Sequence, residues 1–143
     1  MDIRQLTPDL AVAPQIEIDA PARLAEAGFR RLIINRPDDE VGPDLDSAAM
    51  TEAARAAGLE VHFIPFSPQL GITSQMIAAM GEALALPGPT LAYCRSGNRS
   101  TVLWALSQAG KRPKAEMMEI AARAGYDLSG IGPMIDALAA DPI

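Results

Sequence analysis

The sequence predicts a single α/β domain built on a mainly parallel sheet of four or five strands with helices on its faces. Short apolar segments alternate along the chain with longer segments of helical periodicity, which is the pattern of a parallel sheet covered on both sides. The length of 143 residues is enough for one domain with a sizeable core. No repeat, low-complexity tract or linker divides residues 1–143, so we expect one domain.

Four apolar segments are expected to form the strands of this sheet. Each is rich in aliphatic or β-branched residues and is bounded by Gly, Pro or Asp. We interpret the first of them as a short strand at the edge of the sheet and the second as a buried strand. The four segments are residues 10–13, 31–35, 60–64 and 90–94.

Start and stop signals delimit the expected helices. Asp19 is placed as a cap before a helix with Pro21 in its first turn and Gly28 at its end. Thr73 caps a second helix that runs to about residue 86. The remaining helical patterns cover residues 46–57, 99–109, 114–124 and 132–140.

Composition excludes several classes of protein. A net charge of −6 and a pI near 4.7 argue against a general nucleic-acid binder. One cysteine excludes an internal disulfide, and the lack of a CxxC motif or a His/Cys cluster argues against zinc. No apolar run is long enough for a membrane span, and the start "MDIRQLTPDL" lacks a secretory h-region. We therefore expect a cytoplasmic domain without metal or cofactor.

The stretch "YCRSGNRS" carries the chemistry, because it follows an expected strand and opens an expected helix. Ligands of parallel sheets bind beyond the carboxyl ends of the strands, where Cys94 is placed. A glycine at position 97 permits a positive φ, so the backbone N–H groups of residues 95–100 can curl around an anion at the helix start. We expect Arg95, Ser96, Gly97 and Asn98 to form this anion-binding loop.

Cys94 is the expected nucleophile of this loop. A thiol beside a helix N-terminus and two arginines ionises easily, and the thiolate can form a covalent intermediate. Arg99 supplies a planar fork for an oxyanion, and Ser100 is placed to donate a hydrogen bond to the sulfur. The alternative is that Cys94 is only a small buried apolar residue, the usual fate of a lone cysteine.

This loop resembles the active-site loops of two groups of cysteine enzymes. Protein tyrosine and dual-specificity phosphatases carry Cys-x5-Arg followed by Ser or Thr, whereas rhodanese sulfurtransferases carry a loop one residue shorter. The chain has Cys94-x4-Arg99 and then Ser100, which is a phosphatase-like ending on a loop of rhodanese length.

Over nearly the whole chain, the segments "RQLTPDLAVAPQI", "AGFRRLIINRPDDE" and "AGYDLSGI" resemble the phosphatase-like domain family of beta-lactamase hydrolase-like proteins. The resemblance implies a protein-tyrosine-phosphatase-like fold of the dual-specificity type. Some similar domains are fused to metallo-hydrolases or persulfide dioxygenases of sulfide metabolism, which implies a functional link to such a partner.

The same resemblance draws attention to the polar loop "NRPDDE". It follows the expected strand 31–35, so its side chains are placed at the mouth of the site. We assign Arg36 to substrate binding and Asp38 to catalysis, with Asp39 as an alternative to Asp38. A solvated turn is the competing interpretation. His62 is expected to be a surface or packed residue of its strand rather than a general base.

Three functions remain open at this point. A phosphatase needs an acid for the leaving alcohol, and the loop "PFSPQLGIT" holds no carboxylate. Sulfane-sulfur transfer needs no such acid and fits the tighter loop, so we favour a sulfurtransferase over a phosphatase. A non-catalytic anion-binding module is the third reading. The expected substrate is a small anion: a persulfide, thiosulfate or a phosphate ester.

Overall fold

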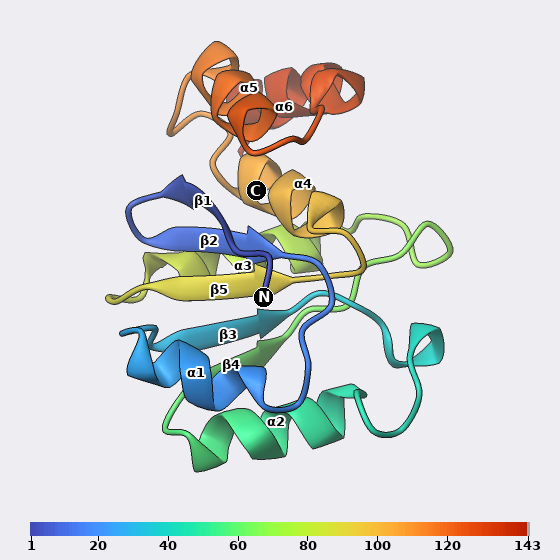
Figure 1. The fold of residues 1–143 in the computed structure, drawn as a ribbon. Helices are drawn as coiled ribbons and strands as arrows, with labels where there is room; N and C mark the ends of the chain where they lie inside the picture. Colours follow the sequence, from blue (N-terminus) through green and yellow to red (C-terminus); the bar gives the residue numbers. More distant parts are fainter. Residues whose placement is uncertain (143) are drawn as a thin grey trace.

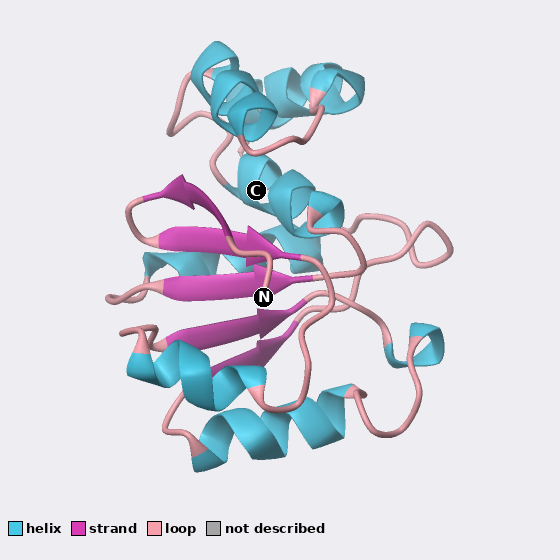
Figure 2. Cartoon of the chain, viewed as in Figure 1, coloured by secondary structure: helices cyan, strands magenta, loops and turns pink. Residues whose placement is uncertain are grey.

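The computed structural model describes residues 1–142, and these form a five-stranded sheet with helices on both faces (Figures 1 and 2). The strand order is β1-β2-β5-β3-β4. The strands are β1 (Arg4–Thr7), β2 (Leu10–Ala13), β3 (Arg31–Ile34), β4 (Glu60–Phe63) and β5 (Thr90–Tyr93). The predicted α/β fold with a mainly parallel sheet is confirmed, because only β1 runs antiparallel to its neighbour.

The prediction that residues 10–13 form an edge strand is wrong. This segment is β2, which lies between β1 and β5 and is buried at every position. The edge on this side of the sheet is formed by β1, which the sequence analysis did not identify, and the other edge is formed by β4. Only one of the four residues of β1 is buried, so β1 lacks the apolar signal of a strand.

The helices follow the predicted order. Asp46 and Thr73 accept capping hydrogen bonds from backbone N–H groups of the following turn, whereas Asp19 makes no cap bond and pairs with Arg23 instead. The elements are α1 (Ala20–Glu26), η1 (Asp38–Glu40), α2 (Ser47–Ala56), α3 (Ser74–Ala85), α4 (Asn98–Ser107), α5 (Lys114–Arg123), η2 (Ser129–Ile131) and α6 (Gly132–Ala140).

Two hydrophobic cores lie on the two faces of the sheet. Successive residues of a strand point to opposite faces, so Ile33 and Ala92 join one core while Leu32 and Leu91 join the other. The first core packs against α3, α4, α5 and α6, and the second packs against α1 and α2. Figure 1 shows α1 and α2 together on one side of the sheet, with α4, α5 and α6 on the other.

Two neighbouring parallel strands lead to helices on opposite faces of the sheet, which creates a topological switch point at their carboxyl ends. The chain leaves β3 for α2 on one face, but it leaves the neighbouring β5 for α4 on the opposite face. The loops after these two strands therefore diverge and leave a crevice between them, which is where parallel sheets bind ligands. Cys94 directly follows β5, the central strand, as predicted.

Within residues 1–142, no helix is both long enough and apolar enough to cross a membrane.

At the amino end of the sheet, the buried side chain of Arg31 joins three segments. Its Nε donates to Glu60 at 2.6 Å, Nη1 to the Thr90 hydroxyl at 3.0 Å, and Nη2 to the Pro87 carbonyl at 3.1 Å. The side chain is only 4% exposed. Losing one partner of a buried polar network leaves the others unsatisfied.

Replacing this arginine should therefore destabilise the fold. Arg31→Met keeps an unbranched apolar stem but removes every donor, and we expect the free energy of unfolding to fall by about 2–4 kcal/mol in urea titrations. The neighbouring Arg30 is exposed, so Arg30→Met is a matched control expected to stay within about 0.5 kcal/mol. Equal stabilities of the two variants would contradict this role of Arg31.

Candidate active site

The loop after β5 wraps around the sulfur of Cys94. Cys94 is 0% exposed, and the backbone N–H of Gly97 donates to its Sγ at 3.0 Å. Gly97 is also the cap residue of α4 and has a φ of +93°. A β-carbon at this position would lie 2.1 Å from the Tyr126 hydroxyl. Both the backbone conformation and the lack of space therefore require glycine here.

Several N–H groups of this loop are available to a ligand. Within residues 1–142, no acceptor is bonded to the backbone N–H groups of Arg95, Ser96, Arg99 and Ser100. The first N–H groups of a helix have no intrahelical partner and carry the positive end of its dipole. The loop that follows Cys94 thus carries four backbone N–H groups without a bonded acceptor among the described residues.

The guanidinium of Arg99 is held in place from two sides. Its Nη1 donates to Glu40 at 2.9 Å and to the Phe66 carbonyl at 2.7 Å, and its Nη2 donates to Glu40 at 2.7 Å. Arginine has five N–H groups in one plane. These contacts use both hydrogens of Nη1 and one of Nη2. The Nε–H and the second Nη2–H lie on one edge and have no acceptor within residues 1–142. This edge suits bidentate binding of an oxyanion.

Glu40 holds both arginines of the site mouth. The hydrogen bonds from Arg99, assisted by Arg36, hold the pKa of Glu40 below its ordinary value of 4.5, although partial burial opposes this shift. Arg36 donates through Nη2 to the Glu40 carbonyl at 3.0 Å and through Nη1 to Gln15 at 3.1 Å. Glu40 is therefore a charged clamp on Arg99 at neutral pH. The sequence analysis gave it no role in the site.

The sequence analysis expected Ser100 to donate a hydrogen bond to the sulfur of Cys94, but the structure shows a different acceptor. The hydroxyl of Ser100 donates to Asn35 Oδ1 at 2.8 Å, and Asn35 Nδ2 donates to the Ile64 carbonyl at 2.9 Å. All of these groups are buried. The amide of Asn35 is fixed by its bond to the Ile64 carbonyl, so that its oxygen faces α4 and accepts the hydrogen bond from the Ser100 hydroxyl.

The two neighbouring aspartates lie in different environments. Asp38 Oδ1 and Oδ2 accept bonds from the backbone N–H and the hydroxyl of Ser47, each at 2.7 Å, at the start of α2. Both carboxylate oxygens of Asp38 are thus used in binding the first residue of α2. Asp39 is exposed and lines the same cleft as Arg99.

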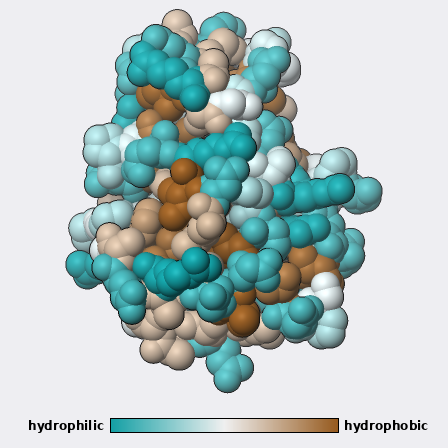
Figure 3. Space-filling model, in the orientation of Figure 1, coloured by the Kyte–Doolittle hydropathy of each residue, from teal (hydrophilic) through white to brown (hydrophobic). Residues whose placement is uncertain are grey.

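An open cleft of about 1000 Å³ contains the predicted anion-binding residues except the buried Gly97. The loops that form it follow the carboxyl ends of β3, β4 and β5. In Figure 3, polar side chains project on the right, the direction in which the strands point in Figure 1. The lining includes Arg36, Asp39, Glu40, Phe66, Gln69, Arg95, Ser96, Asn98 and Arg99.

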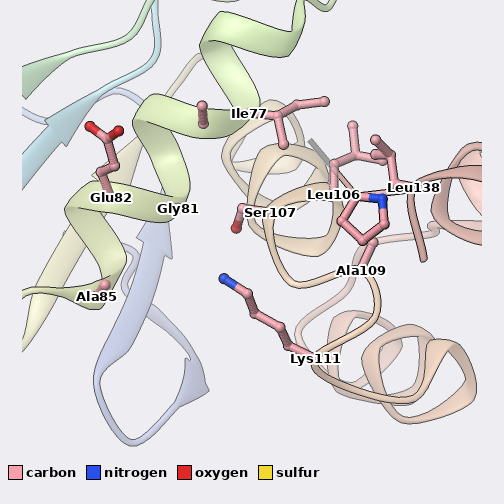
Figure 4. A pocket seen from close by; sticks show the side chains of 11 residues that line it. Ile77, Gly81, Glu82, Ala85, Leu106, Ser107, Ala109, Lys111 and Leu138 are labelled. Atoms are coloured by element: carbon pink, nitrogen blue, oxygen red, sulfur yellow. The ribbon is translucent and has the colours of Figure 1, made fainter. Parts of the chain in front are cut away.

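A smaller cavity of about 380 Å³ lies between α3, α4 and the end of the chain (Figure 4). Its walls are mostly aliphatic, with Glu82, Ser107 and Lys111 as polar members (Figure 4). None of the predicted site residues lines this cavity, whereas Arg36, Arg99 and residues of the loop that follows the buried Cys94 line the larger cleft. We therefore assign the chemistry to the cleft beside Cys94. Within residues 1–142, no group of His, Cys, Asp and Glu side chains is arranged to hold a metal ion.

Comparison with known families explains this arrangement. The model of the phosphatase-like domain of beta-lactamase hydrolase-like proteins matches residues 2–111. The chain belongs to this family. It is 34% identical over 131 residues to the beta-lactamase hydrolase-like protein of Xylella fastidiosa (strain Temecula1 / ATCC 700964), a match that covers 90% of this chain and 30% of that protein. The chain thus spans about a third of the length of the curated relatives it matches.

Solved structures share the fold of this family member. A provisionally named phosphatase from Neisseria meningitidis superposes with a TM-score of 0.80 at 28% identity, covering 96% of this chain and 98% of its own. Tk-PTP in its active form gives a TM-score of 0.70 at 16% identity, covering 99% and 98%. The protein-tyrosine-phosphatase-like fold that the resemblance implied is confirmed.

Protonation of Glu40 gives a test of the clamp. Because its pKa is depressed by folding, the clamp stabilises the protein above pH 4.5 and this stabilisation is lost as the pH falls through the lower value of the folded state. We expect Glu40→Gln to lower the free energy of unfolding at pH 7 by about 1–3 kcal/mol. The difference from the parent should vanish well below pH 4.5 in urea titrations.

A matched control is the exposed pair formed by Glu116 and Arg112, in which the glutamate is 48% exposed. Glu116→Gln should cost less than about 0.5 kcal/mol at pH 7, since exposed ion pairs contribute little. A Glu40→Gln protein that differs from its parent equally at all pH values would refute the charged clamp.

Proposed function

We propose that this family member is a cysteine-dependent phosphatase that hydrolyses phosphomonoesters through a phosphocysteine at Cys94. The single observation that carries this proposal is the set of unbonded donors beside the sulfur. They comprise the loop N–H groups of Arg95, Ser96, Arg99 and Ser100 and the free edge of the Arg99 guanidinium. Such donors match the equatorial oxygens of a phosphoryl group.

The fold supports this choice of chemistry over sulfur transfer. The family is phosphatase-like, and the structural neighbours include a provisionally named phosphatase and Tk-PTP. None of these comparisons supports sulfur transfer, a persulfide substrate or a persulfide dioxygenase partner, which the sequence analysis favoured. A phosphate ester is the substrate class that agrees with both the family and the donors of the cleft.

In the first step, the Cys94 thiolate attacks the phosphorus atom and the bond from phosphorus to the ester oxygen breaks. The leaving oxygen takes a proton from an acid and departs as an alcohol. Arg99 and the loop N–H groups hold the transferring oxygens throughout. In the second step, water attacks the phosphocysteine, which releases inorganic phosphate and regenerates the thiolate.

We assign the proton of the first step to Asp39 rather than to Asp38. Asp39 lines the cleft and is exposed, whereas both carboxylate oxygens of Asp38 are bonded to Ser47. The loop after β4, residues 64–73, carries no carboxylate, so the loop after β3 is the nearest source of an acid.

Intact mass spectrometry distinguishes the two chemistries. After incubation with an aryl phosphate and an acid quench, we expect Cys94 to carry one phosphoryl group, because phosphocysteine is the proposed intermediate. Thiosulfate or glutathione persulfide should leave no added sulfur on the protein. Cys94→Ser is the control and should carry neither adduct, since the chain has one cysteine. A persulfide on Cys94 without any phosphoryl adduct would establish sulfur transfer instead.

The role of the acid is tested by a pair of neighbouring variants. Asp39→Asn should lower kcat roughly 10²- to 10⁴-fold for an alkyl phosphate, whose leaving group needs a proton. With an aryl phosphate, whose leaving group is a weak base, the loss should be small. Asp38→Asn should retain activity, because asparagine can still accept a hydrogen bond at the start of α2. The reverse pattern would identify Asp38 as the acid.

A further inference from the structure

Tyr126 lies in the segment after α5 and reaches the loop of Cys94 from outside it. Its hydroxyl donates to the Ser96 carbonyl at 2.9 Å and lies directly against the α-carbon of Gly97. The residue is only 6% exposed and packs in the core beneath α4 and α5. It belongs to the segment "AGYDLSGI", which has no assigned role in the active site described above.

One peptide unit connects this tyrosine with the sulfur. The Ser96 carbonyl that accepts from Tyr126 and the Gly97 N–H that donates to Cys94 Sγ belong to the same planar group. A bond that fixes the oxygen therefore fixes the direction of the N–H. It also polarises the amide, which makes the N–H a stronger donor.

A second contact holds the tyrosine itself. Arg4 on β1 lies over the ring with its guanidinium carbon 5.0 Å from the centroid, a cation–π arrangement. The same side chain donates to the Ala124 carbonyl at 3.0 Å. Burial raises the pKa of Tyr126, with Arg4 opposing this shift, so the hydroxyl keeps its proton and remains a donor at neutral pH.

We propose that Tyr126 is a positioning residue that orients the Ser96–Gly97 peptide so that its N–H stabilises the thiolate of Cys94. It acts through the loop and does not touch the substrate. The proposal rests on the proposed function only in taking Cys94 as the nucleophile, and it holds for phosphoryl and sulfur chemistry alike.

The ionisation of Cys94 can be measured without any substrate. Alkylation by iodoacetamide, followed by intact mass against pH, reports the thiolate of the one cysteine in the chain. We expect Tyr126→Phe to move the midpoint of this profile about half to one unit higher, so that alkylation at pH 6 slows roughly 3- to 10-fold. At high pH, where the thiol is ionised in both proteins, the rates should agree within about two-fold.

The charged side chains around the loop are the same in parent and variant, so the shift reports the hydroxyl. They are Asp2 and Arg4 at the amino end of the chain, Arg36, Asp39 and Glu40 after β3, and Arg95 and Arg99 after β5. The matched control is Tyr93→Phe, which loses the same atom on the opposite face of the sheet, where the hydroxyl faces Gln15, Arg36 and Asp38 rather than the Ser96–Gly97 peptide. Its midpoint should stay at the parental value.

A second measurement applies even where Tyr126→Phe does not fold. In the Tyr93→Phe background, 3-fluorotyrosine replaces Tyr126 alone, because the chain has two tyrosines. Fluorine makes the phenol a stronger donor, so the midpoint should move to lower pH.

Unchanged midpoints in these variants overturn the proposal. A change in the alkylation rate that is equal at all pH values also overturns it, since that would report only altered access to the thiol. If the alkylation midpoints shift as expected but the protein has no phosphatase activity, the proposed function is refuted and the role of Tyr126 is not.

Discussion

The buried amide of Asn35 joins the elements on which the site depends. Its backbone N–H donates to Tyr93 on β5, and its carbonyl accepts from the N–H of Phe66 after β4. Its side chain donates to Ile64 and accepts from Ser100 on α4. One residue therefore fixes the ends of neighbouring strands relative to the helix that begins beside Cys94. With no exposed surface, these bonds cannot be replaced by water, so loosening any of them would disturb the cleft.

Much of the fold follows from local signals. The parallel strands β2, β3 and β5 are mostly apolar, whereas β4 alternates polar and apolar residues. Helices with capping residues or glycine stops separate them, so the succession of strands and helices along the chain could be predicted from the sequence. The strand β1 could not be predicted, because its side chains are mostly not buried and its partner β2 reads as an edge. An edge is a property of the assembled sheet, and no residue of "LAVA" signals it.

The site likewise has residues that could be predicted from the sequence and residues that could not. Cys94, Gly97 and Arg99 could be identified because the strand end, the positive φ and the helix start are adjacent in the sequence. The acceptor of Ser100 lies 65 residues away, as Asn35, and the partner of Arg99 lies 59 residues away, as Glu40. Such pairs depend on which loops meet at the switch point of the sheet, and that follows from strand order rather than from local pattern.

The contacts of Tyr126 also bear on where the structural unit ends. The family match stops at residue 111, yet Met117, Leu128 and Ile135 are buried against the same core as α4. A fragment cut at the boundary of the match would expose that face of α4 and lose the hydroxyl that holds the loop of the thiol. The unit to express, to graft or to align with other proteins is therefore the sheet together with α5 and α6, and a boundary drawn at the end of the family match would divide it.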